Sequence, residues 1–357
     1  MTNDKYVGLD VHQASTSIAV LDCNGKMISN AVVRTTADAI RDFINGLSGT
    51  IHVTFEEGTQ AAWLYEVIRR LVAELVVCDP RKNKVLAVGN KGDRIDATKL
   101  AELLRAGLLK SVFHSNHDTK LLKQLTHNYD SLVSDTTRVM SRIKAVFRGQ
   151  AIPCSGRDVY YKRNREQWMT RLAEPGLRIR AQFLFDELEP LKALRREAKK
   201  VMLKEARRHQ AFKILSGVPT LGPIRIAQII AAVGAPHRFR TRRQFWAYCG
   251  FAVVTRSTDD YRFDENGPLR RSRPPATRGL NRNFNRRLKH VFKSAALQGA
   301  GHEPFKSYYQ ARVAAGMRPE MARLTLARKI ANITLTLWKN GGQFNERKLS
   351  AQHDRTT

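Results

Sequence analysis

Four acidic residues in this chain lie where a fold can bring their carboxylates together: Asp10, Glu56, Asp93 and Asp96. Asp10 and Glu56 each end an apolar run, YVGLD and IHVTFE, that is typical of a buried strand. Asp93 and Asp96 are three residues apart in GDRIDATKLAELL, which predicts a helix start that turns both carboxylates the same way. Carboxylates held close together repel one another unless a cation lies between them, and all-oxygen sites favour Mg²⁺ or Mn²⁺. The four residues are therefore candidate ligands of a divalent metal.

The second of these strands offers two neighbouring carboxylates, Glu56 and Glu57. Side chains alternate between the two faces of a strand, so Glu56 would face the same side as Thr54 and the opposite side from Phe55. This alternation favours Glu56 as the ligand. The pattern by itself leaves Glu57 open.

The charge of the chain points to a polyanionic partner. Lysine and arginine total 62 against 32 acidic residues, a formal net charge of +30, which is typical of proteins that bind nucleic acid or an anionic membrane. The most apolar stretch, residues 224–235, is short and contains Arg225, which argues against a membrane span. The N-terminus lacks the layout of a secretory signal, and the four cysteines are scattered singly, so we expect a cytoplasmic protein with reduced thiols.

Residues 1–150 are predicted to form an α/β domain with a trailing helix. An antiparallel meander over residues 6–33 precedes alternating helices and strands up to Cys78, an order that fits an RNase H-like sheet. The Gly8-Leu9-Asp10 opening also occurs in sugar kinases and actin-like ATPases. However, no glycine-rich adenosine loop follows in the expected position, and a small-molecule kinase has no need of so high a charge.

The middle of the chain, residues 151–210 with the helix before them, is expected to be a helical linker. Residues 118–147 and 182–209 have the apolar spacing of long amphipathic helices, and the polar stretch 154–176 between them resembles a connector. Pro190 is expected to interrupt the second helix. The pair can serve as a plain spacer or as a coiled-coil dimerisation arm, and the pattern leaves both open.

Residues 211–342 are predicted to be a mostly helical domain, followed by a polar tail over 343–357 that we expect to be disordered. Two short apolar helices flank GVPTLG, an arrangement similar to a helix-hairpin-helix whose backbone amides bind a phosphate near Gly222. A helix hairpin of this kind can also be a mere corner.

The same part of the chain contains its most basic tract, in which arginine dominates and aromatic and amide side chains are interleaved. A run of charge is often only a solvated surface, but the planar guanidinium suits phosphates and base edges better than an ammonium does. The candidate nucleic-acid contacts here are Arg270, Arg271, Arg273, Arg278, Arg282, Arg286 and Arg287.

Taken in order, these motifs resemble the DEDD transposases of insertion sequences, of the insertion sequence 110 type, and the related Piv-type DNA invertases. The acidic motifs are GLDVH with Asp10, FEEG with Glu56, and GDRIDATKLAELL with Asp93 and Asp96. The C-terminal motifs are VPTLGP, HRFRTRRQFWAYCGFAV, TRSTDDY and LARKIANITLTLWKNGGQF. The resemblance covers nearly the whole chain.

The resemblance implies a RuvC-like domain whose four acids hold Mg²⁺ or Mn²⁺, and a serine that attacks DNA. It places the nucleophile at Ser257, although the family's Ser-Gly is Ser257-Thr258-Asp259 here, which leaves Thr258 as an alternative. Attack by Ser257 would give a covalent serine–DNA intermediate, and Arg256 would stabilise charge on the phosphoryl oxygens.

The resemblance also implies the partners: donor and target DNA, a structured bridge RNA that guides their choice, and further copies of the chain, as a dimer of dimers. It implies a bacterial or archaeal, nucleoid-associated protein. Two other classes of nucleic-acid-binding protein are alternatives. A metal-dependent RNase H-like nuclease or Holliday-junction resolvase would cleave without a covalent intermediate, and a noncatalytic scaffold would leave four carboxylates unexplained in a phosphate-binding surface.

Overall fold

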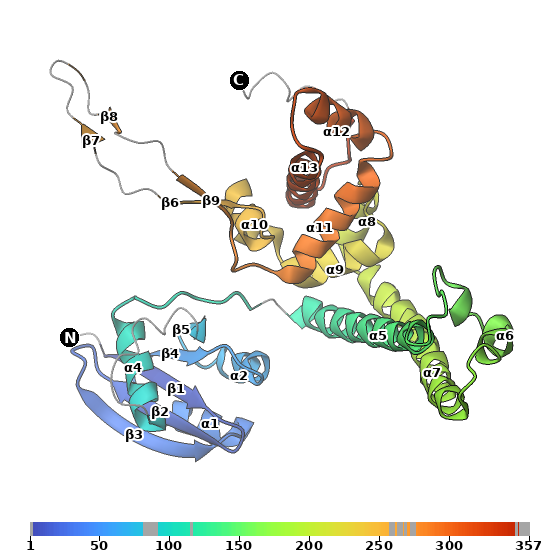
Figure 1. Ribbon diagram of the computed structural model, residues 1–357. Helices are drawn as coiled ribbons and strands as arrows, with labels where there is room; N and C mark the ends of the chain where they lie inside the picture. Colours follow the sequence, from blue (N-terminus) through green and yellow to red (C-terminus); the bar gives the residue numbers. More distant parts are fainter. Residues whose placement is uncertain are drawn as a thin grey trace. The chain divides into compact units, whose positions relative to one another are not determined.

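The computed structural model describes residues 3–80, 92–114, 117–256, 261–262, 267, 270–271, 276–346 and 349 (Figure 1). The chain divides into two compact units, residues 1–114 and residues 115–357. The long helix that the sequence placed at the end of the first domain belongs to the second unit, because it packs along later helices rather than on the sheet.

The first unit is built on a mixed sheet in the strand order β3-β2-β1-β4-β5. Its strands are β1 (Asp4–Val11), β2 (Ser15–Leu21), β3 (Met27–Arg34), β4 (Thr50–Glu56) and β5 (Glu74–Cys78). β1, β2 and β3 pair antiparallel, whereas β4 pairs parallel with both β1 and β5. The predicted meander followed by parallel strands is confirmed, and so is the mixed α/β class of the N-terminal part.

The two faces of this sheet are covered by different helices (Figure 1). Helices α1 (Ala37–Asn45) and α2 (Ala61–Ile68) share a core with the odd-numbered residues of β1 and β4, such as Leu9 and Phe55. Helix α4 (Asp93–Arg105) packs on the even-numbered side of β1. The period-2 alternation of the strands therefore separates a purely structural face from the face that carries the acidic residues.

The second unit begins with helices α5 (His117–Arg148) and α7 (Pro175–Ala206), which pack against each other. The expected interruption at Pro190 is wrong: α7 continues through it. Proline removes one backbone hydrogen bond, and packing along α5 keeps the remainder of the helix in place. The polar stretch between the helices is folded rather than a plain connector, because Val159, Trp168 and Leu172 are buried against α5 and α7.

The rest of this unit is mostly helical, as predicted, with short strand pairs. Its helices are α8 (Gln210–Ser216), α9 (Pro223–Val233), α10 (Arg242–Tyr248), α11 (Arg286–Gly299), α12 (Phe305–Ala314) and α13 (Pro319–Asn340). Strand β6 (Val253–Arg256) pairs with β9 (Ala276–Leu280), and β7 (Tyr261–Arg262) with β8 (Arg270–Arg271). In the described part of the chain, no helix combines the length and apolarity needed to cross a membrane.

Candidate active site

The acidic face of the sheet is formed by a close approach between Gly8 of β1 and helix α4. A side-chain carbon on Gly8 would collide with the carbonyl oxygen of Ala97 and lie 2.7 Å from the backbone nitrogen of Ala101. Only a residue without a Cβ lets the helix backbone come this near. This contact brings the first turn of α4 to the end of β1, where Asp10 lies.

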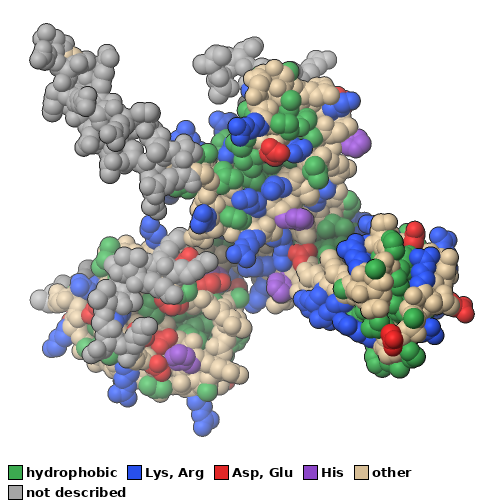
Figure 2. All heavy atoms as spheres, in the orientation of Figure 1, with side chains coloured by type: hydrophobic (Ala, Val, Ile, Leu, Met, Phe, Trp, Pro, Cys, Tyr) green, Lys and Arg blue, Asp and Glu red, His purple; other side chains and the backbone are tan. Residues whose placement is uncertain are grey.

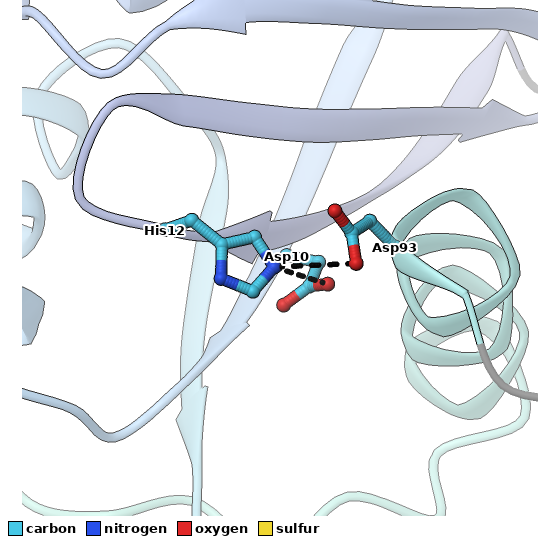
Figure 3. A group of neighbouring side chains, drawn as sticks. All are labelled: Asp10, His12 and Asp93. Carbon is cyan, nitrogen blue, oxygen red and sulfur yellow. Dashed lines mark ion pairs between the residues drawn. The ribbon is translucent and has the colours of Figure 1, made fainter.

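Three side chains meet at this point: Asp10 and His12 from the end of β1, and Asp93 from the first turn of α4 (Figure 3). The imidazole Nε2 of His12 lies 3.3 Å from Oδ2 of Asp10 and 3.4 Å from Oδ1 of Asp93. The three groups are accessible, because the side chains of His12 and Asp93 are more than half exposed and that of Asp10 is about one quarter exposed. The arrangement is an open, acidic site that a cation and a substrate can both reach.

The carboxyl group of Asp10 is the most perturbed of these charges. Partial burial raises its pKa, the neighbouring His12 lowers it, and the negative charges of Asp93 and Asp96 raise it again, so that the net shift is upward. Asp96, one turn after Asp93 on α4, therefore acts on the same point. The negative charge at Asp10 is therefore less favourable in the protein than in water, and a cation at this point would stabilise it.

Glu56 and Glu57 leave the end of β4 in different directions. Leu9 pairs with Phe55, so Glu56 continues β4 beside the end of β1 and, by alternation, on the side of Asp10. Glu57 instead pairs with His114, whose Nε2 lies 2.7 Å from Oε2 of the carboxylate, and this histidine stacks on Tyr65. Glu57 thus turns toward His114, and Glu56 is an exposed residue at the strand end.

His12 is the residue of this cluster that the sequence reasoning did not select. A signal for it exists, since a residue two positions after Asp10 on a strand falls on the same face. A histidine at this position could also be a turn residue without a role in the site. The backbone amide of His12 does donate a hydrogen bond to the carbonyl of Ser15 in the turn to β2. Only the position of Asp93 in space distinguishes the two readings.

Comparisons with known proteins agree with this geometry. Residues 7–151 match a family model described as a transposase of the DEDD type of insertion sequence 110, and residues 212–310 match one described as "Transposase IS116/IS110/IS902 family". The two matches together span more than half of the chain. The chain belongs to the IS110 family of transposases.

Two similar curated proteins are also named as transposases. The chain is 26% identical over 275 residues to "Putative transposase y4qE" of Sinorhizobium fredii, which covers 72% of this chain and 65% of that protein. It is 26% identical over 184 residues to "Transposase for insertion sequence element IS1533" of Leptospira borgpetersenii, which covers 48% of this chain and 51% of that protein. The chain thus spans between half and two thirds of the length of these relatives.

For this IS110-family chain, part of the expected nucleic-acid surface lies outside the described residues. Ser257, Thr258 and Arg273 are among them. Arg256 ends β6, Arg270 and Arg271 form β8, and Arg278 lies in β9, but the structure describes only the backbone of these four arginines. Their roles stay predictions.

Three of the remaining candidates, Gly222, Arg286 and Arg287, line a groove of about 670 Å³ between α5, α9 and α11. Gly222 caps the N-terminus of α9 there, with open space where a side chain would be, and Arg286 and Arg287 begin α11. Arg287 is bound within the unit: its Nε lies 2.6 Å from Oδ2 of Asp130. Arg286 is exposed, as is Arg282 just before α11, so these two are available to an external anion.

Proposed function

We propose that this chain is a DNA transposase that cuts and rejoins DNA by phosphoryl transfer at the acidic face of its N-terminal unit. The observation that carries the proposal is the meeting of Asp10 and Asp93 at one point, with the charge of Asp96 acting on it, in a chain that matches the family along both units. A chain of formal net charge +30 also suits a polyanionic substrate.

The donor set at this face fits a divalent metal. We propose that Asp10, Glu56, Asp93 and Asp96 hold Mg²⁺ or Mn²⁺, because hard cations take carboxylate oxygens. The pKa of Asp10 is raised first by burial and then by the charges of Asp93 and Asp96, and a cation would offset those charges. Glu56 is preferred to Glu57 because strand alternation puts it on the side of Asp10, whereas Glu57 turns toward His114. A bound metal of this kind withdraws charge from a phosphoryl oxygen and lowers the barrier to attack.

The serine chemistry is proposed on the resemblance in TRSTDDY. The hydroxyl oxygen of Ser257 forms a bond to phosphorus, the hydroxyl proton leaves, and the bond from phosphorus to one strand oxygen breaks, so that oxygen departs with a proton. The number of phosphodiester bonds is unchanged, and the reverse attack by a strand hydroxyl rejoins DNA and regenerates the serine. Arg256, the residue immediately before Ser257, would stabilise charge on the phosphoryl oxygens.

The partners follow from the same proposal. Donor and target DNA would be chosen by base pairing with a bridge RNA, while the protein holds both nucleic acids by shape and charge. Joining four strands needs several active sites, so a dimer of dimers is proposed, with the α5 and α7 pair as a candidate coiled-coil arm. Association with the nucleoid is proposed on the same grounds.

The test is to trap the intermediate. The full chain is incubated with Mg²⁺, DNA carrying the ends of its own element, and RNA transcribed from beside its reading frame. Denatured products are then analysed by mass spectrometry for a peptide joined to DNA. We expect a phosphodiester on Ser257 that Ser257→Ala eliminates. An adduct on Thr258 would move the nucleophile by one residue, and metal-dependent cleavage with no adduct would favour the hydrolytic nuclease or resolvase.

A further inference from the structure

A second groove in the C-terminal unit combines basic, aromatic and amide side chains in its lining. It has a volume of about 710 Å³ and lies where α10, β6, α12 and α13 meet. Five of its lining residues are cations: Arg242, Arg243, Arg312, Arg328 and Lys329. None of these five is among the candidate nucleic-acid contacts predicted from the sequence, although Arg242 and Arg243 lie in the motif HRFRTRRQFWAYCGFAV. Lys and Arg side chains are numerous on the helical unit in Figure 2.

The cations of this groove have no carboxylate among its lining residues, all of which the structure describes. Like charges gathered at one place repel one another and raise the free energy of the folded protein. The consequence is visible at Lys329, whose pKa is lowered by burial and by the neighbouring charges of Arg312 and Arg242. Burial likewise lowers the pKa of Arg328. An anion in the groove would offset this cost.

Two buried polar atoms on the walls of the groove also lack hydrogen-bond partners among the described residues. They are Nε of Arg312, a donor, and Oδ1 of Asn332, an acceptor. Buried polar groups are rarely left unsatisfied, because each one costs free energy when it loses water without gaining a partner. Once these side chains turn toward the groove, a phosphate oxygen would satisfy the donor, whereas a group with a hydrogen, such as a base amine or sugar hydroxyl, would satisfy the acceptor.

Aromatic rings complete the lining. The ring of Tyr308 lies 5.3 Å from the guanidinium of Arg312 and 5.7 Å from the ammonium of Lys329. Trp246 is held in one orientation because its Nε1 donates to the carbonyl of Arg328 at 3.2 Å. Flat rings beside cations are the combination on which unpaired bases stack while their phosphates bind basic side chains.

We propose that this groove binds a single nucleic-acid strand, with phosphates against the arginines and an unpaired base and its sugar against Tyr308, Trp246 and Asn332. A duplex hides its base faces in the stack, so it would satisfy the cations but neither the rings nor Asn332. The inference rests on the proposed function and deepens it, because Thr255, which lines the groove, precedes Ser257 by two residues in the chain. The groove thus belongs to the segment that leads to the proposed nucleophile.

The test compares two double variants that remove the same charge. Arg242→Gln with Arg243→Gln alters exposed residues of the groove, and Arg207→Gln with Arg208→Gln alters exposed residues of the same unit outside it. Binding of the full chain to a fluorescent single-stranded DNA oligonucleotide is measured by anisotropy at several salt concentrations, with EDTA present so that no cleavage is required. The same sequence as a duplex is measured in parallel.

The groove variant is expected to flatten the salt dependence of single-strand binding by about 1.4 in log–log slope, at about 0.7 for each phosphate that the protein no longer neutralises. It is expected to melt at the same or a higher temperature than the wild type, because it relieves repulsion, whereas a merely structural pair of arginines would stabilise the fold. Asn332→Leu is expected to weaken single-strand binding more than duplex binding, since it removes the side-chain amide and leaves the charge of the groove unchanged.

Three results would overturn the inference. The first is an equal salt-dependence slope for the groove variant and the variant outside it. The second is an equal loss of affinity for duplex and single strand in Asn332→Leu. The third is a melting temperature of the groove variant below that of the wild type. Because the assay requires no chemistry, it is independent of the adduct experiment. If the binding assay rejects the groove but a Ser257 adduct is trapped, the proposed function still holds. If the groove binds single strands as expected but no serine adduct forms, the serine mechanism is rejected and the groove is kept.

Discussion

Each unit of this protein gathers like charges, but the two regions manage the repulsion differently. In the N-terminal unit, Asp10 and Asp93 have the imidazole of His12 between them. In the C-terminal groove, by contrast, the lining includes no carboxylate. In both regions the pKa shift favours the neutral form of the side chain: the pKa of Asp10 is raised, and the pKa of Lys329 is lowered. In the acidic site a histidine of the same chain lies beside the carboxylates. In the basic groove, a bound anion would reduce the repulsion between the cations.

The largest effect is expected when the acidic region loses a carboxylate. Asp10→Asn or Asp96→Asn should lower DNA cleavage by about a thousandfold, the scale on which the loss of one preorganised electrostatic group acts. DNA binding should stay equal or become slightly tighter, because a negative charge beside phosphate is removed. Asp38→Asn, which removes an exposed carboxylate on α1, serves as the control and should cleave normally. A wild-type cleavage rate for Asp10→Asn would reject the site.

The second prediction tests whether the close approach of α4 creates the acidic region. Gly8→Ala places a methyl group against the backbone of Ala97, so it should destabilise the protein by about 1–3 kcal/mol, as overpacking does. Because the helix must move away, cleavage should fall even at temperatures where the variant is folded. Gly58→Ala, with open space around the added carbon, is the matched control. Urea denaturation and cleavage assays measure both effects, and equal stability of the two variants would show that the contact is not tight.

The third prediction concerns the basic side of the comparison outside the proposed groove. Replacing Arg282 and Arg286 together with alanine should flatten the salt dependence of duplex binding by about 1.8 in log–log slope, at about 0.9 for each phosphate. Arg287→Ala should act differently, because it removes the ion-pair partner of Asp130, whose carboxylate is half-buried. We expect its main effect on thermal stability. An unchanged slope for the double variant would show that these arginines are only solvated.

The smallest effect is expected on the stability of the metal-free protein. The pKa of Asp10 is raised in the folded state, so its ionised form costs stability at neutral pH, and that cost disappears as pH falls through the folded pKa toward 3.8. Asp10→Asn should therefore raise the melting temperature in EDTA at pH 7 slightly. The advantage should shrink in acid, and calorimetry across pH measures it. A constant difference would assign the effect to packing.

Local patterns were sufficient for much of the acidic site. The alternation in YVGLD and IHVTFE predicted strands whose ends carry Asp10 and Glu56, and the helix-forming GDRIDATKLAELL put Asp93 in the first turn of α4. These are short-range properties, set by period and by turn signals within about a dozen residues. The continuity of α7 through Pro190 was not predictable in this way, because packing against α5 outweighs the local penalty.

The sequence by itself determined which residues carry charge, which faces of the strands are apolar, and which family motifs the chain contains. Only the tertiary structure decided that Gly8 admits α4 closely enough to bring Asp93 to Asp10, and that His12 lies between them. It alone assembled the basic groove from Arg242 to Asn332, on elements far apart in the chain. The physical reason is that such contacts depend on long-range packing, which no local period encodes, whereas charge and amphipathicity are written residue by residue.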